Sequence, residues 1–229
     1  MYIIIVSANS EWQNAVEILA PQRLHTSPYG EWFEYESAWE SVIVVHGGWG
    51  KIAAAASAQY AIDHWKPLAI LNIGTCGGLA GRAAVGDIIL AERTVVSDFV
   101  VEIGSLDEEE AAYVTMLEPP ALLRTRLPLS VLQGTIASGD RDVQRSDVQR
   151  LVDRYDALAA DWESASIAFV AKQNGVPCAI LRGVSDVVGE HHADAYDGRD
   201  HAFHNGTRAI MQRLLGELPS ILEAVATTL

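Results

Sequence analysis

The chain has 229 residues, of which 49% are hydrophobic and 20% are charged; this composition excludes disorder and suits one folded domain. The net charge of −14 disfavours binding to nucleic acid or to an anionic membrane surface. Apolar runs such as 1–6 and 42–45 are too short to span a membrane, and the first of them does not resemble a secretion signal. We therefore expect a cytoplasmic protein. Two cysteines, Cys76 and Cys178, are too few for a disulfide framework.

Strands alternate with helices along the whole sequence. Apolar runs predict strands at 2–7, 32–36, 41–46, 68–73, 85–91, 131–137 and 178–184. Helical spacing, ended by Gly or Pro, predicts helices at 10–19, 51–65, 146–155, 163–174 and 204–224. Ser10 is placed to cap the first helix. The sequence thus predicts an α/β fold, a single domain over 1–229 with a central mixed β-sheet flanked by helices.

Small residues, hydroxyls and acids follow several of the predicted strands. In α/β sheets ligands bind beyond the carboxyl ends of the strands, so we expect these segments to share one rim. They are 7–12, 46–51, 74–78, 138–143 and 185–186. The first of them carries Asn9 and Glu11 as candidate site residues.

Two patterns fall short of the chemistry that they suggest. Residues 48–53 fit a dinucleotide fingerprint, but no acid follows at the distance needed to hold a ribose, and Ile52 replaces the Ser or Thr of a Walker loop. We therefore expect no cofactor. A second pattern, a group of acids and histidines, lacks the His-Glu-x-x-His spacing, so we interpret it as a solvated loop and expect no metal site. Its members are Glu190, His191, His192, Asp194, His201 and His204.

Other reactive or charged residues have simpler interpretations. Cys76 lies in a Gly-rich turn with no basic partner nearby, which favours a small packing residue over a nucleophile. The acidic run 107–110 is interpreted as a solvated loop, with a lid over the site as the alternative. No Gly-x-Ser-x-Gly elbow supports hydrolysis through an activated serine.

Glu163 and Asp186 differ from the other acids because each lies within largely apolar sequence. A buried carboxylate is costly unless something pairs with it, which makes both residues candidates for function. The structural alternatives stay open: Glu163 in the first turn of a helix, where the dipole favours it, and Asp186 as a helix cap.

A set of motifs, taken together and in this order, resembles the nucleoside phosphorylase and nucleosidase superfamily, and within it the bacterial 5'-methylthioadenosine/S-adenosylhomocysteine nucleosidases. The resemblance runs from residue 1 to about residue 215. The motifs are Gly47-Gly48-Trp49-Gly50-Lys51, Asn72-Ile73-Gly74-Thr75-Cys76-Gly77-Gly78, Val85-Gly86-Asp87-Ile88, Ser138-Gly139-Asp140, Trp162-Glu163-Ser164-Ala165 and Arg182-Gly183-Val184-Ser185-Asp186.

The resemblance implies hydrolysis of a purine nucleoside by a homodimer whose partner closes the pocket for the 5' substituent. Asp186, paired with Ser185, resembles the acid that donates to purine N7, and Glu163 resembles the acid that binds the ribose hydroxyls. The other implied roles are as follows: Thr75 and Arg182 hold the nucleophile, Trp162 lies under the sugar, Val143 reads the purine edge, and Trp49 and Tyr196 line the 5' pocket.

Three positions depart from the family pattern. In the nucleosidases, the Glu that activates water lies four residues after the alanine that closes the first strand. In this sequence that alanine is Ala8, the fourth residue after it is Trp12, and Glu11 lies one residue earlier. Asp142 stands where an aromatic residue often stacks on the base, and Trp49 is larger than the usual aliphatic residue. Either a shortened first loop lets Glu11 reach the water, or another group activates it.

General chemistry agrees with these assignments. Cleavage of an N-glycosidic bond leaves positive charge on the ribose and negative charge on the base, so it needs an acid at the base and acceptors around the sugar. Asp186 must therefore be protonated and Glu163 ionised. One alternative is a phosphorylase. Phosphorylases of the superfamily usually carry Arg in the first loop and before the Gly-Thr turn, but here the first loop has no Arg and Asn72 stands at the second place. The other alternative is a non-catalytic purine-binding protein, which the displaced Glu11 and Asp142 favour.

Overall fold

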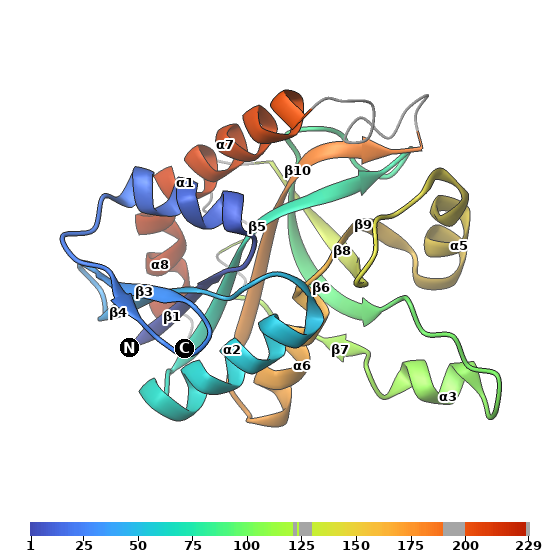
Figure 1. The fold of residues 1–229 in the computed structure, drawn as a ribbon, viewed down its shortest axis with the longest axis horizontal. Helices are drawn as coiled ribbons and strands as arrows, with labels where there is room; N and C mark the ends of the chain where they lie inside the picture. The colour runs from blue at the N-terminus through green and yellow to red at the C-terminus, as the bar shows by residue number, and fades with distance from the viewer. Residues whose placement is uncertain (121–122, 124–129, 190–199, 228–229) are drawn as a thin grey trace.

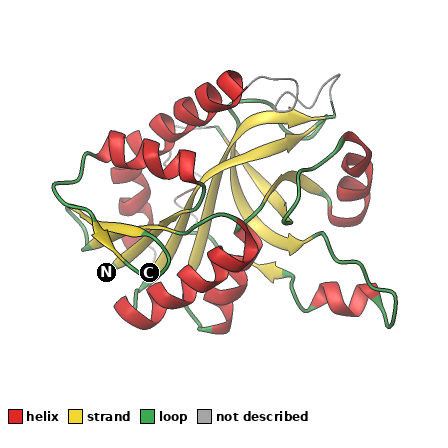
Figure 2. Cartoon of the chain, in the orientation of Figure 1, coloured by secondary structure: helices red, strands yellow, loops and turns green. Residues whose placement is uncertain are grey.

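The strands join in one mixed β-sheet, as the alternating sequence pattern predicts (Figures 1 and 2). The computed structural model describes residues 1–120, 123, 130–189 and 200–227. Its strands are β1 (Tyr2–Val6), β2 (His25–Thr26), β3 (Glu31–Tyr35), β4 (Val42–His46), β5 (Ala69–Leu79), β6 (Ile88–Val96), β7 (Thr115–Met116), β8 (Val131–Ser138), β9 (Ala157–Asp161) and β10 (Cys178–Val188). The predicted α/β class with a central mixed sheet is confirmed.

Part of the sheet closes on itself. The strand order is β10-β6-β8-β9-β5-β1-β4-β3-β2, and β10 also pairs with β5, so five strands form a closed ring. The pairing of β5 with β10 is parallel and continues to Val188, past an irregularity between Val184 and Asp186. Because β5 and β10 lie side by side over their whole lengths, residues at their carboxyl ends are brought to one place.

Helices cover both faces of the sheet (Figures 1 and 2). Successive strand residues point to opposite faces: Ile4 of β1 packs with α1, α7 and α8, whereas Ile3 and Ile5 pack with α2 and α6. The described helices are α1 (Asn9–Leu19), α2 (Gly50–Trp65), α3 (Leu106–Ala111), α5 (Arg145–Tyr155), α6 (Ser164–Gln173), α7 (Asp200–Gly216) and α8 (Leu218–Ala226). No helix in these ranges is long and apolar enough to cross a membrane.

Several predicted elements need correction. The segment 107–110 is not a solvated loop, because α3 forms there and Glu110 is buried, accepting a hydrogen bond of 2.7 Å from Arg154 Nε. Ser10 does not cap α1, since the cap is Ala8 and Ser10 already lies in the first turn. The predicted helix at 204–224 is two helices, α7 and α8. Strands β2, β7 and β9 were not predicted; the first two have only two residues each.

Candidate functional site

A pocket opens at the carboxyl ends of β5, β9 and β10, next to the first turns of α1 and α2. It brings together most of the candidate residues from six separate segments of the chain. Asn9 is exposed and does not line it, and Tyr196 lies outside the described residues. The lining residues are Ala8, Glu11, Trp49, Thr75, Cys76, Gly77, Asp142, Val143, Ala160, Asp161, Trp162, Glu163, Ser185, Asp186 and Val188.

Glu11 reaches this pocket although the sequence places it one residue early. Helix α1 begins at Asn9, which turns Glu11 towards the end of β5, where it is only 2% exposed. Its Oε1 accepts hydrogen bonds from the Thr75 amide at 2.5 Å and from Thr75 Oγ1 at 2.7 Å. Trp12 points elsewhere and stacks on His46. Glu11 therefore lines the pocket, as the first of the two alternatives requires, and its role in activating water stays a prediction.

Arg182 is fully buried and does not line the pocket itself. Its Nη2 donates to Asn72 Oδ1 at 2.8 Å, which fixes the plane of the guanidinium. The side chain enters so closely that a Cβ on Gly74 would come within 2.2 Å of Nη1. Only glycine fits at this position, because any larger residue would displace the guanidinium.

Three carboxyls surround this single guanidinium. Asp161 Oδ2 lies 3.0 Å from Nε, Glu11 Oε1 lies 3.6 Å from Nη1, and Glu163 Oε2 lies 3.6 Å from Nη2. The exposed fraction of each carboxyl side chain is 5% or less. Such a cluster carries a net negative charge when its acids are ionised, in a place where water cannot screen it.

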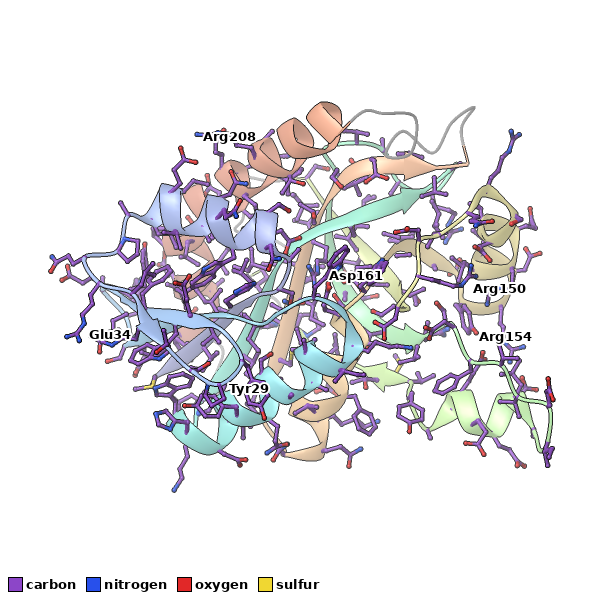
Figure 3. The ribbon with its side chains drawn as sticks, viewed as in Figure 1. Tyr29, Glu34, Arg150, Arg154, Asp161 and Arg208 are labelled. Carbon is purple, nitrogen blue, oxygen red and sulfur yellow. The ribbon has the colours of Figure 1, made fainter. Side chains whose placement is uncertain are left out.

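Asp161 is a site residue that the sequence reading missed. It ends β9, and Figure 3 labels it in the middle of the molecule. Its Oδ1 accepts from Ser138 Oγ at 2.5 Å, and the Ser164 hydroxyl donates to Oδ2. An acid at the end of an apolar run, just before Trp162-Glu163, was the available signal.

The first residue of α2 holds the Glu163 side chain. Gly50 has a φ of 83°, a conformation that favours glycine, and its amide donates to Glu163 Oε1 at 3.1 Å. Burial raises the pKa of Glu163 to about 8, against the opposing effect of Arg182 and with the help of Asp161 and Glu11. A carboxyl with this pKa is mostly protonated at pH 7, which differs from the ionised state expected from the sequence.

Asp186 lies in β10 and is therefore not a helix cap. Ser185 Oγ donates to Asp186 Oδ1 at 2.7 Å, so the Ser-Asp pair presents one oriented carboxyl to the pocket. Nearby, burial raises the pKa of the Cys76 thiol well above its usual range. Because the thiolate is the reactive form, Cys76 is a poor nucleophile, in agreement with the packing role predicted for it.

Aromatic and apolar residues form the remaining walls of the pocket. The rings of Trp49 and Trp162 stack with centroids 4.9 Å apart, and Trp49 is 62% exposed. Val143 also lines the pocket, and Asp142 is an exposed residue of the lining. The pocket thus combines flat apolar surfaces with carboxyls, an arrangement suited to a ring system attached to a polar sugar.

The acid-and-histidine cluster lies largely outside the described residues, which leave out 190–199. Within the described ranges, no group of three or more His, Cys, Asp or Glu side chains is placed to hold a metal ion. The glycine turn at 48–50 brings the Gly50 amide to the Glu163 carboxyl.

Comparisons with known proteins point to one family. A family model described as the phosphorylase superfamily matches residues 2–222. A protein from Tolumonas auensis named 5'-methylthioadenosine/S-adenosylhomocysteine nucleosidase is 27% identical over 199 residues, covering 82% of this chain and 86% of that protein. A protein of the same name from Listeria welshimeri is 29% identical over 176 residues, covering 71% of this chain and 76% of that one.

Solved structures share the fold. A mutant Helicobacter pylori nucleosidase with 5'-methylthioadenosine in its active site aligns with a TM-score of 0.79, 19% identity and 97% coverage of both chains. The Neisseria meningitidis nucleosidase in complex with methylthio-immucillin-A aligns with a TM-score of 0.78, 23% identity, and coverage of 97% of this chain and 99% of that one.

Proposed function

The chain belongs to the phosphorylase superfamily, and on that basis we propose that it hydrolyses the N-glycosidic bond of a purine nucleoside. The substrates are 5'-methylthioadenosine and S-adenosylhomocysteine, and the products are adenine and the 5'-substituted ribose. The names of the Tolumonas and Listeria relatives support this substrate class. The observation that carries the reaction type is the charge of the pocket, whose described lining includes five acids and no Lys, Arg or His.

Asp186 is the general acid of this reaction. As the bond between ribose C1' and purine N9 breaks, its electron pair moves into the base, and Asp186 gives its proton to N7. Ser185 fixes the orientation of the carboxyl through its hydrogen bond to Oδ1. A neutral purine is a far better leaving group than a purine anion, which is the purpose of this proton transfer.

Glu163 and Trp162 hold the ribose. The Glu163 carboxylate accepts from the ribose hydroxyls, and its negative charge favours the cationic sugar that develops as the bond breaks. Because only ionised Glu163 accepts both hydroxyls, the pKa of about 8 means that binding costs it a proton at pH 7. The flat face of Trp162 lies under the sugar, and Trp49 extends this surface towards the 5' substituent.

Glu11 activates the water. A water molecule attacks C1', its oxygen forms the new C–O bond, and its proton passes to Glu11 Oε. Two donors from Thr75 hold the Glu11 carboxylate in place, and Arg182 faces it from below. The protons balance, since Asp186 loses one to the base and Glu11 gains one from water.

Phosphate does not suit this pocket. A phosphate ion carries between one and two negative charges at neutral pH and needs cations or several amide donors. Arg182 is fully buried and already faces three carboxyls. The hydrolase assignment is therefore favoured over the phosphorylase.

The test is base release from a panel of purine nucleosides in the presence and absence of phosphate. We expect adenine release from 5'-methylthioadenosine and S-adenosylhomocysteine at the same rate in both buffers. A rate that depends on phosphate would identify a phosphorylase. Adenine that binds without any turnover of a nucleoside would instead identify the non-catalytic purine-binding protein, an alternative that loses support now that Glu11 lies in the pocket.

We also propose a homodimer in which the partner covers the exposed side of α2. Trp49 and Ile52 are 62% and 85% exposed there, next to the pocket mouth, which is a large apolar surface for a free monomer. Analytical ultracentrifugation of Ile52→Glu tests this. We expect monomers from this variant and dimers from the control Val85→Glu, which changes an exposed valine in the turn between β5 and β6; a dimer of Ile52→Glu would contradict the proposal.

We place the reaction in the cytoplasm. Cys76 and Cys178 are both free thiols, which a reducing compartment preserves. Fractionation of cells that produce the tagged protein tests this location, and recovery from the medium would contradict it.

A further inference from the structure

The three carboxyls around Arg182 differ in how many donors they have. Glu11 accepts from Thr75 N, Thr75 Oγ1 and, at 3.2 Å, from Ala8 N. Asp161 accepts from Ser138 Oγ and from the amide and hydroxyl of Ser164. Glu163 accepts from the Gly50 amide. Hydrogen bonds to a carboxylate stabilise its ionised form, so Glu163 is the carboxyl on which a proton of this cluster rests.

Asp161 touches the guanidinium at a different atom from the other two acids. Its Oδ2 lies 3.0 Å from Nε, while Glu11 and Glu163 face Nη1 and Nη2. Ser138 on β8 and Ser164 on α6 tie the Asp161 carboxylate to two further elements. The position of Arg182 is therefore fixed from its Nε side by an anion with several donors.

We propose that Asp161 is a positioning residue that holds the Arg182 guanidinium between Glu11 and Glu163, and whose negative charge keeps a proton on Glu163 at neutral pH. Without Asp161, one guanidinium would face two carboxyls, and both would be ionised more readily. The kinetic consequence of this inference rests on the proposed nucleosidase activity, whereas the location of the proton does not.

Other charged groups near the cluster leave this assignment unchanged. Asp161 is the closest acid to Arg182, and the cluster lies in the interior where charges act strongly on each other. Cys76, Asp142 and Asp186 also line the pocket, and a small cavity that Asp161 shares is lined by Asp98, Arg141, Asp147 and Arg150. Lys51 donates to Asp98 and Asp140.

The experiment uses Asp161→Asn, which keeps the size of the side chain and an acceptor oxygen for Arg182 but removes the charge. Carboxyl carbons of glutamate are labelled with ¹³C, and the Glu163 signal is identified by its loss in Glu163→Gln. The matched control is Asp156→Asn, at an exposed position with a φ of 51°, which asparagine adopts readily. Both variants and the unmodified chain are titrated by NMR.

We expect the Glu163 titration midpoint to fall by about one unit or more in Asp161→Asn and to stay unchanged in Asp156→Asn. The pH dependence of kcat/KM for 5'-methylthioadenosine should shift the same way, raising the ratio of activity at pH 6 to that at pH 8. A purely structural role would lower activity at all pH values without moving either midpoint.

An unchanged Glu163 midpoint in folded Asp161→Asn would overturn the inference. If that variant fails to fold, Asp161→Ser decides, because it also removes the negative charge and should lower the Glu163 midpoint; no shift would again overturn the inference. If the unmodified chain releases no base from any nucleoside, the proposed function fails, but the NMR titration still decides the role of Asp161.

Discussion

The two ends of the pocket both present carboxyls, but in opposite surroundings. At the end where we propose that the sugar binds, called the sugar end, Glu11, Asp161 and Glu163 surround the fully buried Arg182. At the base end, Asp186 is partly exposed at the end of a strand beside the Ser185 hydroxyl. In the function that we propose, one end holds negative charge near a sugar that becomes positive, and the other delivers a proton to the base.

The largest expected effect is at the sugar end, with Glu11→Gln. Glutamine keeps the shape and accepts from Thr75, but it takes no proton from water, so turnover should fall by about 10²–10⁴-fold while 5'-methylthioadenosine still binds. Single-turnover kinetics and calorimetric binding measure the two quantities. The control is Glu17→Gln on the same helix, whose exposed carboxylate pairs with Arg208. Full activity of Glu11→Gln would place the base elsewhere.

At the base end, Asp186→Asn should keep the fold and lower turnover by about 10²–10⁴-fold, because asparagine has no proton to donate to N7. The loss should be smaller for nucleosides whose base leaves easily without protonation. Steady-state rates on 5'-methylthioadenosine and on a p-nitrophenyl riboside compare the two cases. Equal losses on both substrates would show that Asp186 does not act as the acid.

The protonation of Glu163 predicts a dependence of stability on pH. Its pKa is raised to about 8 in the folded chain, above the ordinary value of 4.5, so the folded state holds a proton that the unfolded state has lost. Stability from this group is therefore present below about pH 4.5 and is lost as the pH rises to about 8. Relative to the unmodified chain, Glu163→Gln should gain on the order of 3 kcal/mol between pH 5 and pH 8.

Chemical denaturation at the two pH values measures this difference. A gain of zero would show that Glu163 is ionised in the folded chain, and the two ends of the pocket would then differ less than we infer.

The smallest expected effect is at the exposed mouth of the base end. Asp142→Asn removes one charge from a solvent-accessible group, and we expect KM to change by less than about tenfold with kcat unchanged. Asp153→Asn on the exposed face of α5 is the control. A large loss in kcat would contradict this prediction and would show that Asp142 takes part in the reaction.

Much of this arrangement was predictable from the sequence, because strand ends in an α/β sheet gather by topology. Glu163 and Asp186 were found as acids in apolar surroundings, and the pocket brings both together. The direction in which Glu11 points was not predictable, since it depends on helix α1 beginning at Asn9, and helix starts shift by a residue or two without a change in pattern.

Burial was harder to predict than position. Arg182 lies within an apolar strand, but the sequence around it does not show how many acids face it. Those acids come from β9 and α1, which reach β10 only in the folded chain. Asp161 was missed because β9 has only five residues and ends in an acid. The raised pKa of Glu163 follows first from its burial and then from Asp161 and Glu11 beside it.

The most direct test of the central claim, that water and not phosphate attacks the sugar, is a reaction in H₂¹⁸O with phosphate present. We predict that mass spectrometry will find one ¹⁸O atom in the released 5-methylthioribose, before exchange at C1, with no sugar 1-phosphate. Unlabelled sugar 1-phosphate appearing in step with adenine would contradict the account.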